Sequence, residues 1–463
     1  MGFVLAVLAC VREHTVKKLL FPVLVITVLY VLLGFGISLH SIFDYATIGS
    51  FDATTFGETP KIRLLSGWLS ALGITSDAIL CGTIILMRDT LNSVREIVFA
   101  FGLVVWIAFL SRKDFLGTFK TVRKTVLWGM ALLIPYIACE VLHLFGMGAT
   151  DVLKAINSIL YDPCSFLGWY PPLVSPNQVR GTWTEPAYFA IWLAFAVPFL
   201  VSYFFKDGLL SLKRAVIAVV FFSTLFSIWF MTYARTSVVL MTILVGLYLF
   251  FAVLFRTREN LEKSALLLVT LFLGFFIISM WGPQNASVLL DDTIKSSVDA
   301  KSRSNPTKLQ VFYLKFQVFE DNPFFGAGDT LASVAQICKM KEIPDQLTGE
   351  SRQRMAYTHA KGIFQSGVNG SSLSVSGVLA CRGLSGFTAI FVPIFLLGLS
   401  LFVRLFKVRE KSREIGITLF VSCSGAFVAV FSQGLWYFYF WASAGLALAF
   451  LLQIPKEPCS KKI

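Results

Sequence analysis

Long runs of apolar residues recur along the whole chain, and many are long enough to cross a bilayer as a helix of about 20 residues. Polar connections between these runs carry most of the charge. The pattern predicts an all-α polytopic membrane protein with about 11–12 transmembrane helices. The predicted spans are residues 19–39, 64–87, 97–110, 126–145, 187–205, 215–233, 238–255, 265–281, 387–403, 415–431 and 436–454.

Five short basic loops orient the second half of the chain. Residues 112–124, 206–214, 256–263, 404–414 and the tail after 454 carry 5, 3, 3, 5 and 3 Lys and Arg residues. Alternating spans place all five on one side, which the positive-inside rule makes cytoplasmic. The same count puts Arg12, Lys17 and Lys18 outside, so the rule leaves the topology of about the first 110 residues open.

One long connection, residues 284–372, falls on the opposite side and is nearly neutral, with 10 basic and 9 acidic residues. We therefore divide the chain into a first membrane part (1–283), a large external loop with amphipathic helices (284–385) and a C-terminal membrane part (386–463). The formal net charge of +13 is explained by the cytoplasmic loops rather than by nucleic-acid binding. No metal-ligand spacing and no nucleotide-binding loop occurs, so neither metal nor cofactor is expected.

The stretch "VRGTWTEPAYFAIW" places Arg180 and Glu185 directly before a predicted span. Pro186 suits the first helical position, which leaves Glu185 or Thr184 as the cap. The pair is therefore either a helix cap with an interfacial arginine or part of an active site. A second charge, Arg235 in "MTYARTSVV", sits in a short external turn, where it either extends its side chain to the interface or binds an anion.

The external loop contributes further candidates. In "KSRSNPTKLQVFYLKFQVFEDNPFFGAGD", Ser304 or Asn305 caps a predicted helix whose Leu309, Phe312, Phe316 and Phe319 form one apolar face, on the membrane surface or over the bundle. Arg303 precedes that helix, and Arg382 and His359 follow later in the loop. Several arginines in one external pocket would suit a pyrophosphate, because guanidinium groups bind phosphate oxygens bidentately.

These motifs, in this order, resemble the bacterial O-antigen polymerase (Wzy-type) and O-antigen ligase superfamily. The resemblance covers residues 180–403 and depends on "RGTWTEPAYFA", "ARTS", an "SR" before an amphipathic helix, "NPFFGAG" and "GLSG" before the next span. It implies a GT-C-type membrane glycosyltransferase in the bacterial inner membrane that works on the periplasmic face without a metal. Its donor and acceptor would be undecaprenyl-pyrophosphate-linked glycans, and a chain-length-regulating co-polymerase is a further expected partner besides membrane lipid.

By position, Arg235 and Arg303 match the family's arginines that hold the donor pyrophosphate, and Arg180 and Glu185 match a charged pair of the polymerases. The ligase branch has His-Asn where this chain has Val368-Asn369. That departure favours a polymerase and leaves the general base open between Glu185 and His359. Arg382 is a further candidate for binding the leaving pyrophosphate.

Two alternatives remain. A ligase would move finished polysaccharide to lipid A core or protein, and a polysaccharide or lipid flippase would move its cargo without breaking a bond. Transporters concentrate ionisable groups within the membrane, where the sequence offers mainly Asp77 and Glu140, the latter with His143 as a neighbour three residues on.

Overall fold

The structure is a computed structural model that describes residues 28–43, 60–99, 101–165, 172–175, 177–206, 208–282, 305–361, 374–433 and 438–454. This part of the chain is helical and contains no strand. Six of its helices are long and apolar enough to cross a membrane. The prediction of an α-helical polytopic membrane protein is confirmed at this level. The six are α6 (Phe115–Leu144), α8 (Pro186–Phe204), α9 (Leu212–Phe230), α10 (Arg235–Phe255), α11 (Arg258–Trp281) and α16 (Val375–Leu405).

The chain forms two compact units, which differ from the three parts drawn from sequence. Unit 1 comprises Met1–Trp106, Asp299–Leu397 and Val430–Trp441. Unit 2 comprises Ile107–Val298, Gly398–Ala429 and Ala442–Ile463. Helices α5 and α16 each pass from one unit to the other. The large loop therefore belongs mainly to unit 1, together with the N-terminal helices.

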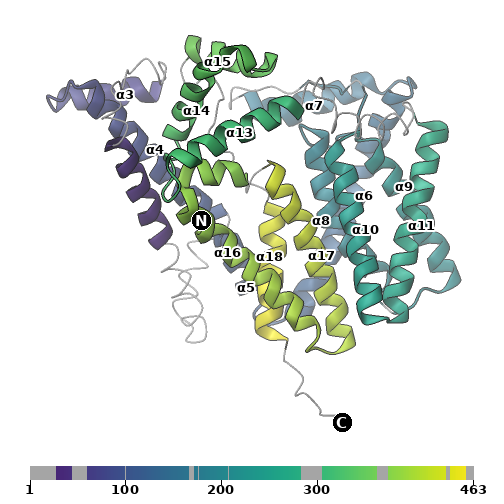
Figure 1. The fold of residues 1–463 in the computed structure, drawn as a ribbon. Coiled ribbons are helices and arrows are strands. Elements are labelled where there is room, and N and C mark those ends of the chain that lie inside the picture. The colour runs from purple at the N-terminus through teal and green to yellow at the C-terminus, as the bar shows by residue number, and fades with distance from the viewer. Residues whose placement is uncertain are drawn as a thin grey trace. The chain divides into compact units, whose positions relative to one another are not determined.

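Unit 2 is a helical bundle built around α8 (Figure 1). Helix α8 packs against α6 and α10, while α9 packs against α11. The side chains from Phe189 to Val201 are buried throughout, and this all-round apolar character is what a central helix of a bundle requires. Two further helices of this bundle are α17 (Glu410–Gln433), of which unit 2 holds most, and α18 (Phe438–Gln453).

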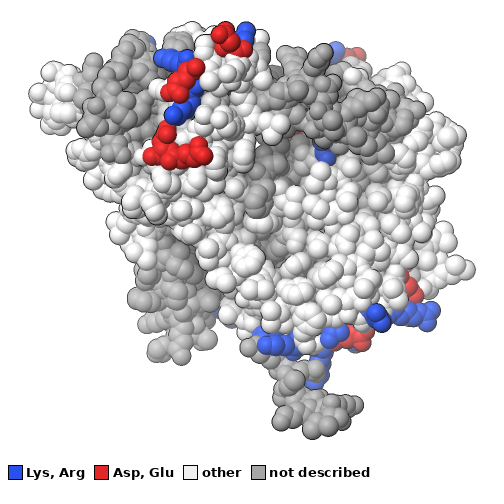
Figure 2. Space-filling view, viewed as in Figure 1, with Lys and Arg blue, Asp and Glu red and all other residues white. Residues whose placement is uncertain are grey.

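The basic loops gather at one end of unit 2, as their charge predicted. Figure 2 shows Lys and Arg side chains along the lower edge of this unit, below a band of the same face without visible charge. The prediction that these loops share one side is confirmed, and the assignment of that side to the cytoplasm stays a prediction. Contacts join neighbouring loops in five places: Leu210 with Glu262, Lys263 with Glu414, Arg404 with Leu451 and Ile454, Ser111 with Gln453, and Arg123 with Ser202.

The predicted span 64–87 is wrong, because two helices occupy it. Helix α3 (Pro60–Ala71) ends in a left-handed turn at Gly73, where the N–H of Ile74 reaches back to the Leu69 carbonyl. Helix α4 (Asp77–Phe99) then begins and continues through residues 88–96, which were expected to form a loop. The predicted span 97–110 is also wrong, since α5 (Phe101–Leu110) has only 10 residues and is too short to cross a membrane.

The described part of the large loop is helical and belongs to unit 1 (Figure 1). Helix α13 (Asn305–Asp321) packs against α14 (Leu331–Glu342) and α15 (Gly349–Lys361). Asn305 begins α13 and Pro306 follows it, as the sequence predicted. The face of α13 that is buried carries Leu314 and Val318, whereas Leu309, Phe312 and Phe316 of the predicted apolar face are exposed.

Candidate functional site

The candidate site in unit 2 lies at the end opposite the basic loops. We call this the far end: it consists of the last turn of α6, α7 (Thr150–Ser165), residues 172–185 and the turn between α9 and α10. The N–H of Val179 donates to the Met231 carbonyl at 2.9 Å. This bond holds the segment that carries Arg180 and Glu185 against the turn that precedes Arg235. Two motifs more than 50 residues apart in sequence thus become neighbours.

Arg180 is buried at the far end, with 2% of its surface exposed. Its Nη2 donates to the carbonyls of Pro172 at 2.6 Å and Leu173 at 2.9 Å. The guanidinium lies over the ring of Tyr161, 4.9 Å from the centroid. Arg180 therefore fixes the fold of its own loop and directs these donors to the backbone rather than to a surface where a pyrophosphate would bind.

Glu140 on α6 fixes the same loop from the other side. Its carboxylate accepts the N–H of Gly181 at 2.8 Å and that of Arg180 at 3.3 Å. The expected partner of Glu140, His143, instead contacts the hydroxyl of Thr150 at 2.8 Å. A buried carboxylate is satisfied here by backbone donors, so Glu140 has a structural role in this conformation.

A narrow pocket opens beside these groups. It is too tight in this conformation to hold a diphosphate, and the predicted pyrophosphate cradle is not seen around Arg180. The residues that line it are Glu140, His143, Leu153, Asn157, Val174, Ser175, Gln178 and Arg180.

Glu185 and Arg235 occupy a different environment at the far end, because both are only partly buried. Glu185 is the N-cap of α8 with Pro186 after it, but its side chain makes no capping bond to the helix. Arg235 is the first residue of α10, after a turn in which Tyr233 is left-handed and Thr232 contacts Ser237 at 2.6 Å. The structure leaves both side chains partly accessible to a ligand.

Helices α8 and α10 run in the same direction, pack against each other and both begin at the far end. Each helix N-terminus presents unpaired N–H groups and a partial positive charge. Arg235 adds a full positive charge at one of them. The far end of unit 2 is therefore suited to an anionic group, for which helix N-termini are ready-made binding elements.

In unit 1, the loop with the motif "NPFFGAGD" is hydrogen-bonded to the backbone of α16 at a point where this helix is interrupted. The helix is interrupted at Gly383, whose φ of 58° and ψ of −157° are not helical. The carbonyls freed by the break, Ala380 and Cys381, accept the N–H groups of Ala327 and Gly328, both at 2.8 Å. These two hydrogen bonds from the loop take the place of helical hydrogen bonds that are lost at the break.

The converse bonds complete this exchange. The N–H groups of Leu384 and Ser385 donate to the carbonyls of Pro323 and Phe324, at 2.8 and 3.0 Å. The two backbones cross so closely that a Cβ on Gly326 would lie 2.4 Å from the backbone nitrogen of Arg382, and one on Gly383 would lie 2.5 Å from the Phe324 carbonyl carbon. Glycine is required at both positions.

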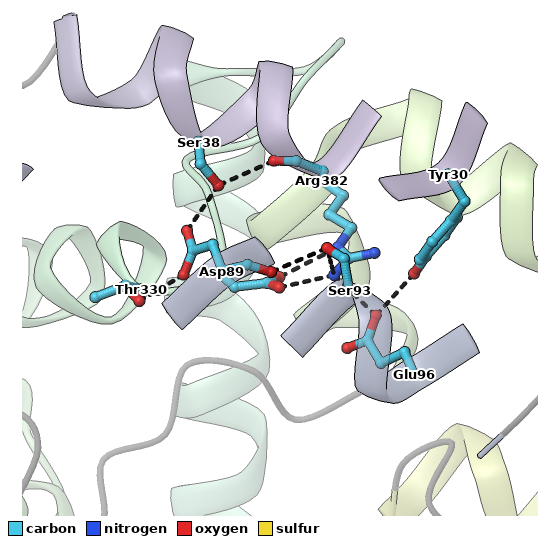
Figure 3. A network of polar contacts seen from close by, with 9 residues as sticks. Tyr30, Ser38, Asp89, Ser93, Glu96, Thr330 and Arg382 are labelled. Atoms are coloured by element: carbon cyan, nitrogen blue, oxygen red, sulfur yellow. Dashed lines mark hydrogen bonds and ion pairs between the residues drawn. The ribbon is translucent and has the colours of Figure 1, made fainter. Parts of the chain in front are cut away.

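Arg382, next to the break, is the centre of a buried ionic network (Figure 3). Its guanidinium donates to both carboxylate oxygens of Asp329, at 3.2 and 2.7 Å. The Nη2 atom also lies 2.8 Å from the Glu96 carboxylate and 3.2 Å from Ser93. The ring of Tyr30 covers the guanidinium at 4.7 Å, and the Tyr30 hydroxyl donates to Glu96. Arg382 is thus neutralised by protein carboxylates.

The network extends to Asp89, one turn of α4 before Ser93. Ser38 donates to Asp89 at 2.9 Å, and Thr330 donates to it at 2.5 Å (Figure 3). The sequence analysis does not find Asp89 and Glu96, because residues 88–96 fall between two of its predicted spans. Once α4 is continuous, Asp89, Ser93 and Glu96 fall at i, i+4 and i+7 on one face, which is the signal that would have found them.

The structure does not describe the side chains of two predicted site residues, Arg303 and His359. Arg303 lies outside the described residues. His359 falls in the last turn of α15, in unit 1, and the structure describes only its place in that helix. Among the described residues, no group of three His, Cys, Asp or Glu side chains could hold a metal ion.

Comparison of the chain with protein-family models, with curated proteins and with solved structures finds no match.

Proposed function

We propose that the protein polymerises undecaprenyl-pyrophosphate-linked oligosaccharide repeats on the periplasmic face of the bacterial inner membrane, releasing undecaprenyl pyrophosphate. The observation that carries this proposal is the far end of unit 2, where the N-termini of two packed parallel helices lie at the same end as Arg235. A diphosphate leaving group is the kind of anion that such an arrangement stabilises.

The proposed step is a direct displacement at the donor sugar. A hydroxyl oxygen of the acceptor repeat forms a bond to the anomeric carbon, and the bond from that carbon to the diphosphate oxygen breaks. The electron pair leaves with undecaprenyl pyrophosphate, whose charge Arg235 and the α8 and α10 N-termini stabilise. Glu185, which is partly exposed at the start of α8, takes the proton of the hydroxyl.

The structure changes the roles proposed for the other arginines. Arg180 acts as a positioning residue that holds residues 172–185 in place, because its guanidinium binds the backbone there. Arg382 holds the "NPFFGAGD" loop against α16 through Asp329, and does not reach the phosphate in this proposal. Arg303 keeps its place as a second proposed phosphate ligand, and His359 as the alternative base, both on the resemblance of the sequence alone.

The test is polymerisation of a purified lipid-linked repeat by the protein in detergent or nanodiscs. Arg235→Ala should abolish chain growth, with a loss of about 100-fold or more, as for removal of one transition-state charge donor. Arg258→Ala is a matched control: Arg258 also begins a helix of unit 2, but at the opposite end. Full polymer from the Arg235→Ala protein would refute the proposed phosphate site.

Replacing the acceptor in the same assay separates the ligase alternative. A ligase would join a preformed polysaccharide to lipid A core and would not lengthen the lipid-linked repeat. A polymerase should give a ladder of products from lipid-linked repeats alone.

A flippase is a second candidate, favoured by the buried ionic network of Asp89, Glu96, Asp329 and Arg382 in unit 1. Ionisable groups away from water mark substrate or proton pathways in many transporters. Movement of a fluorescent lipid-linked repeat across liposomes, without any change in its length, would support transport and count against the polymerase.

A further inference from the structure

Helix α13 has two apolar faces, and in the part of the chain that the structure describes only one of them packs against other helices. Leu314 is fully buried with Met340 and Leu347, and Val318 is buried with Ala327 and Ala332. The other face exposes four large side chains, each between 37% and 68% accessible: Leu309, Phe312, Tyr313 and Phe316.

These four residues stand at i, i+3, i+4 and i+7, so they form one continuous stripe along the helix. A helix that only needed to cover the core of unit 1 would carry polar residues on this side. Instead, three aromatic rings and a leucine face outward. Exposed apolar stripes of this kind mark surfaces that a partner or a membrane covers.

Exposed aromatic residues also follow the end of α13, beside α16. Phe324 and Phe325, directly after α13, are also exposed. The backbone of Phe324 is bonded to Ser385 of α16, which fixes this loop beside α16. From Leu384 onward α16 exposes further large apolar side chains, including Val392 and Phe395. Helix α16 is long and apolar enough to cross a membrane, and exposed apolar side chains of such a helix suit contact with lipid.

Charged residues lie at the C-terminal end of the stripe. Glu320 is exposed one turn after Phe316 on the same side of α13. Asp321 pairs with Lys339 of α14 at 3.1 Å. Helix α15 follows the C-terminal end of α14, which lies about 18 Å along α14 from the α16 break. Its exposed residues include Arg352 and Gln353. The polar part of the loop region therefore lies away from the lipid-facing surface of α16.

We infer that the stripe of α13, with Phe324 and Phe325, lies in the lipid bilayer, at the boundary between headgroups and acyl chains. The occupant is phospholipid of the membrane that α16 spans. Tyr313 and Glu320 would stay at headgroup level, while Leu309, Phe312, Phe316 and Phe324 reach the acyl chains. The large loop is thereby anchored to the membrane surface through α13. This inference does not depend on the proposed glycosyl transfer.

The test is photo-crosslinking to lipid in nanodiscs of phosphatidylethanolamine and phosphatidylglycerol. The photoreactive residue p-benzoylphenylalanine replaces one aromatic residue at a time in the full chain: Phe312, Phe324, Phe395 or Tyr357. Phe395 on α16 is the positive control. Tyr357 on α15 is the matched control, because it is aromatic and 50% exposed but lies on the polar helix. Mass spectrometry after irradiation measures the phospholipid adduct on each peptide.

Phe312 and Phe324 should give phospholipid adducts in yields close to that of Phe395 and severalfold above that of Tyr357. Three results would overturn the inference: no adduct at Phe312 and Phe324 while Phe395 reacts, equal yields at Phe312 and Tyr357, or crosslinks from Phe312 to protein or to a co-purified polyprenyl lipid instead of phospholipid. Only variants that elute as a single folded species are compared.

Discussion

Two buried arginines, one in each unit, have different hydrogen-bond partners. In unit 2, the guanidinium of Arg180 donates to the backbone carbonyls of Pro172 and Leu173 and is bonded to no carboxylate of the described residues. In unit 1, Arg382 contacts two carboxylates, those of Asp329 and Glu96. Carbonyl dipoles satisfy hydrogen bonds, whereas carboxylates also cancel charge. The two arginines should therefore respond very differently to substitution.

The comparison also separates both of them from Arg235. Arg180 and Arg382 are buried, whereas Arg235 is partly exposed at a helix N-terminus of the proposed phosphate site. Loss of Arg235 should therefore change activity more than stability.

The largest effect is expected for Arg382→Ala. The substitution leaves Asp329 and Glu96 buried without their cation, which costs about 3–5 kcal/mol of unfolding free energy. The thermal unfolding midpoint in detergent and the yield of monodisperse protein measure this loss. Adding Asp329→Asn to the variant should recover part of it, because one uncompensated charge is removed. Additive losses in the double variant would show that the two side chains are not coupled.

A smaller loss is expected for Gly326→Ala. The new Cβ would lie 2.4 Å from the backbone of Arg382, and the residue has a φ of +68°, so the substitution should cost at least about 2 kcal/mol. Gly398→Ala in the same α16 is the control, since no heavy atom lies within 4 Å of its new Cβ. That control should be neutral or slightly stabilising. An equal drop in unfolding midpoint for both would contradict the tight crossing of the two backbones.

Arg180→Ala should be milder, with a loss of about 1–2 kcal/mol, because it leaves buried carbonyls short of a donor, while the nearby Glu140 carboxylate keeps its backbone N–H donors. Activity should fall together with the unfolding midpoint, since the loop before Glu185 loosens. Wild-type stability with strongly reduced activity would instead return Arg180 to direct substrate binding.

The smallest effect concerns the pair between the half-buried Lys339 and the exposed Asp321. The hydrogen bond to the Asp321 carboxylate raises the pKa of Lys339 above its ordinary value. A raised lysine pKa adds stability below the ordinary pKa, and that stability is lost as pH rises through the folded pKa, above about pH 10. Lys339→Met should therefore change stability by less than about 1 kcal/mol at neutral pH. A loss of several kcal/mol at pH 7 would show a structural role for the pair.

Most of the bundle of unit 2 could be predicted from sequence, because α8, α9, α10 and α11 are continuous apolar runs bounded by short charged turns. The N-terminal helices could not. A hydropathy window averages across Gly73, where a left-handed residue ends α3. The charges of α4 also lower its apparent apolarity, although two of them, Asp89 and Glu96, are buried. The pairing of Asp89 and Glu96 with residues of other helices decides that burial, and the local pattern does not contain those partners.

The candidate site was predicted in part. The motifs around Glu185 and Arg235 do meet, and the helix starts at Pro186 and Arg235 lie at the same end of unit 2. The role of Arg180 could not be predicted from sequence, because its partners are backbone carbonyls. Every residue has such a carbonyl, so the residue types give no sign of this pairing. The role of Arg382 was hidden because Asp329 lies 53 positions away in the chain.

The exchange of backbone bonds between the "NPFFGAGD" loop and the α16 break also has a consequence for biosynthesis. In a bilayer, an interrupted helix leaves polar backbone groups without water to satisfy them. Because residues 322–328 leave the ribosome before α16, the partner of the bend already exists when α16 reaches the translocation machinery. A chain lacking that loop would leave the carbonyls of Ala380 and Cys381 and the N–H groups of Leu384 and Ser385 without these partners during insertion.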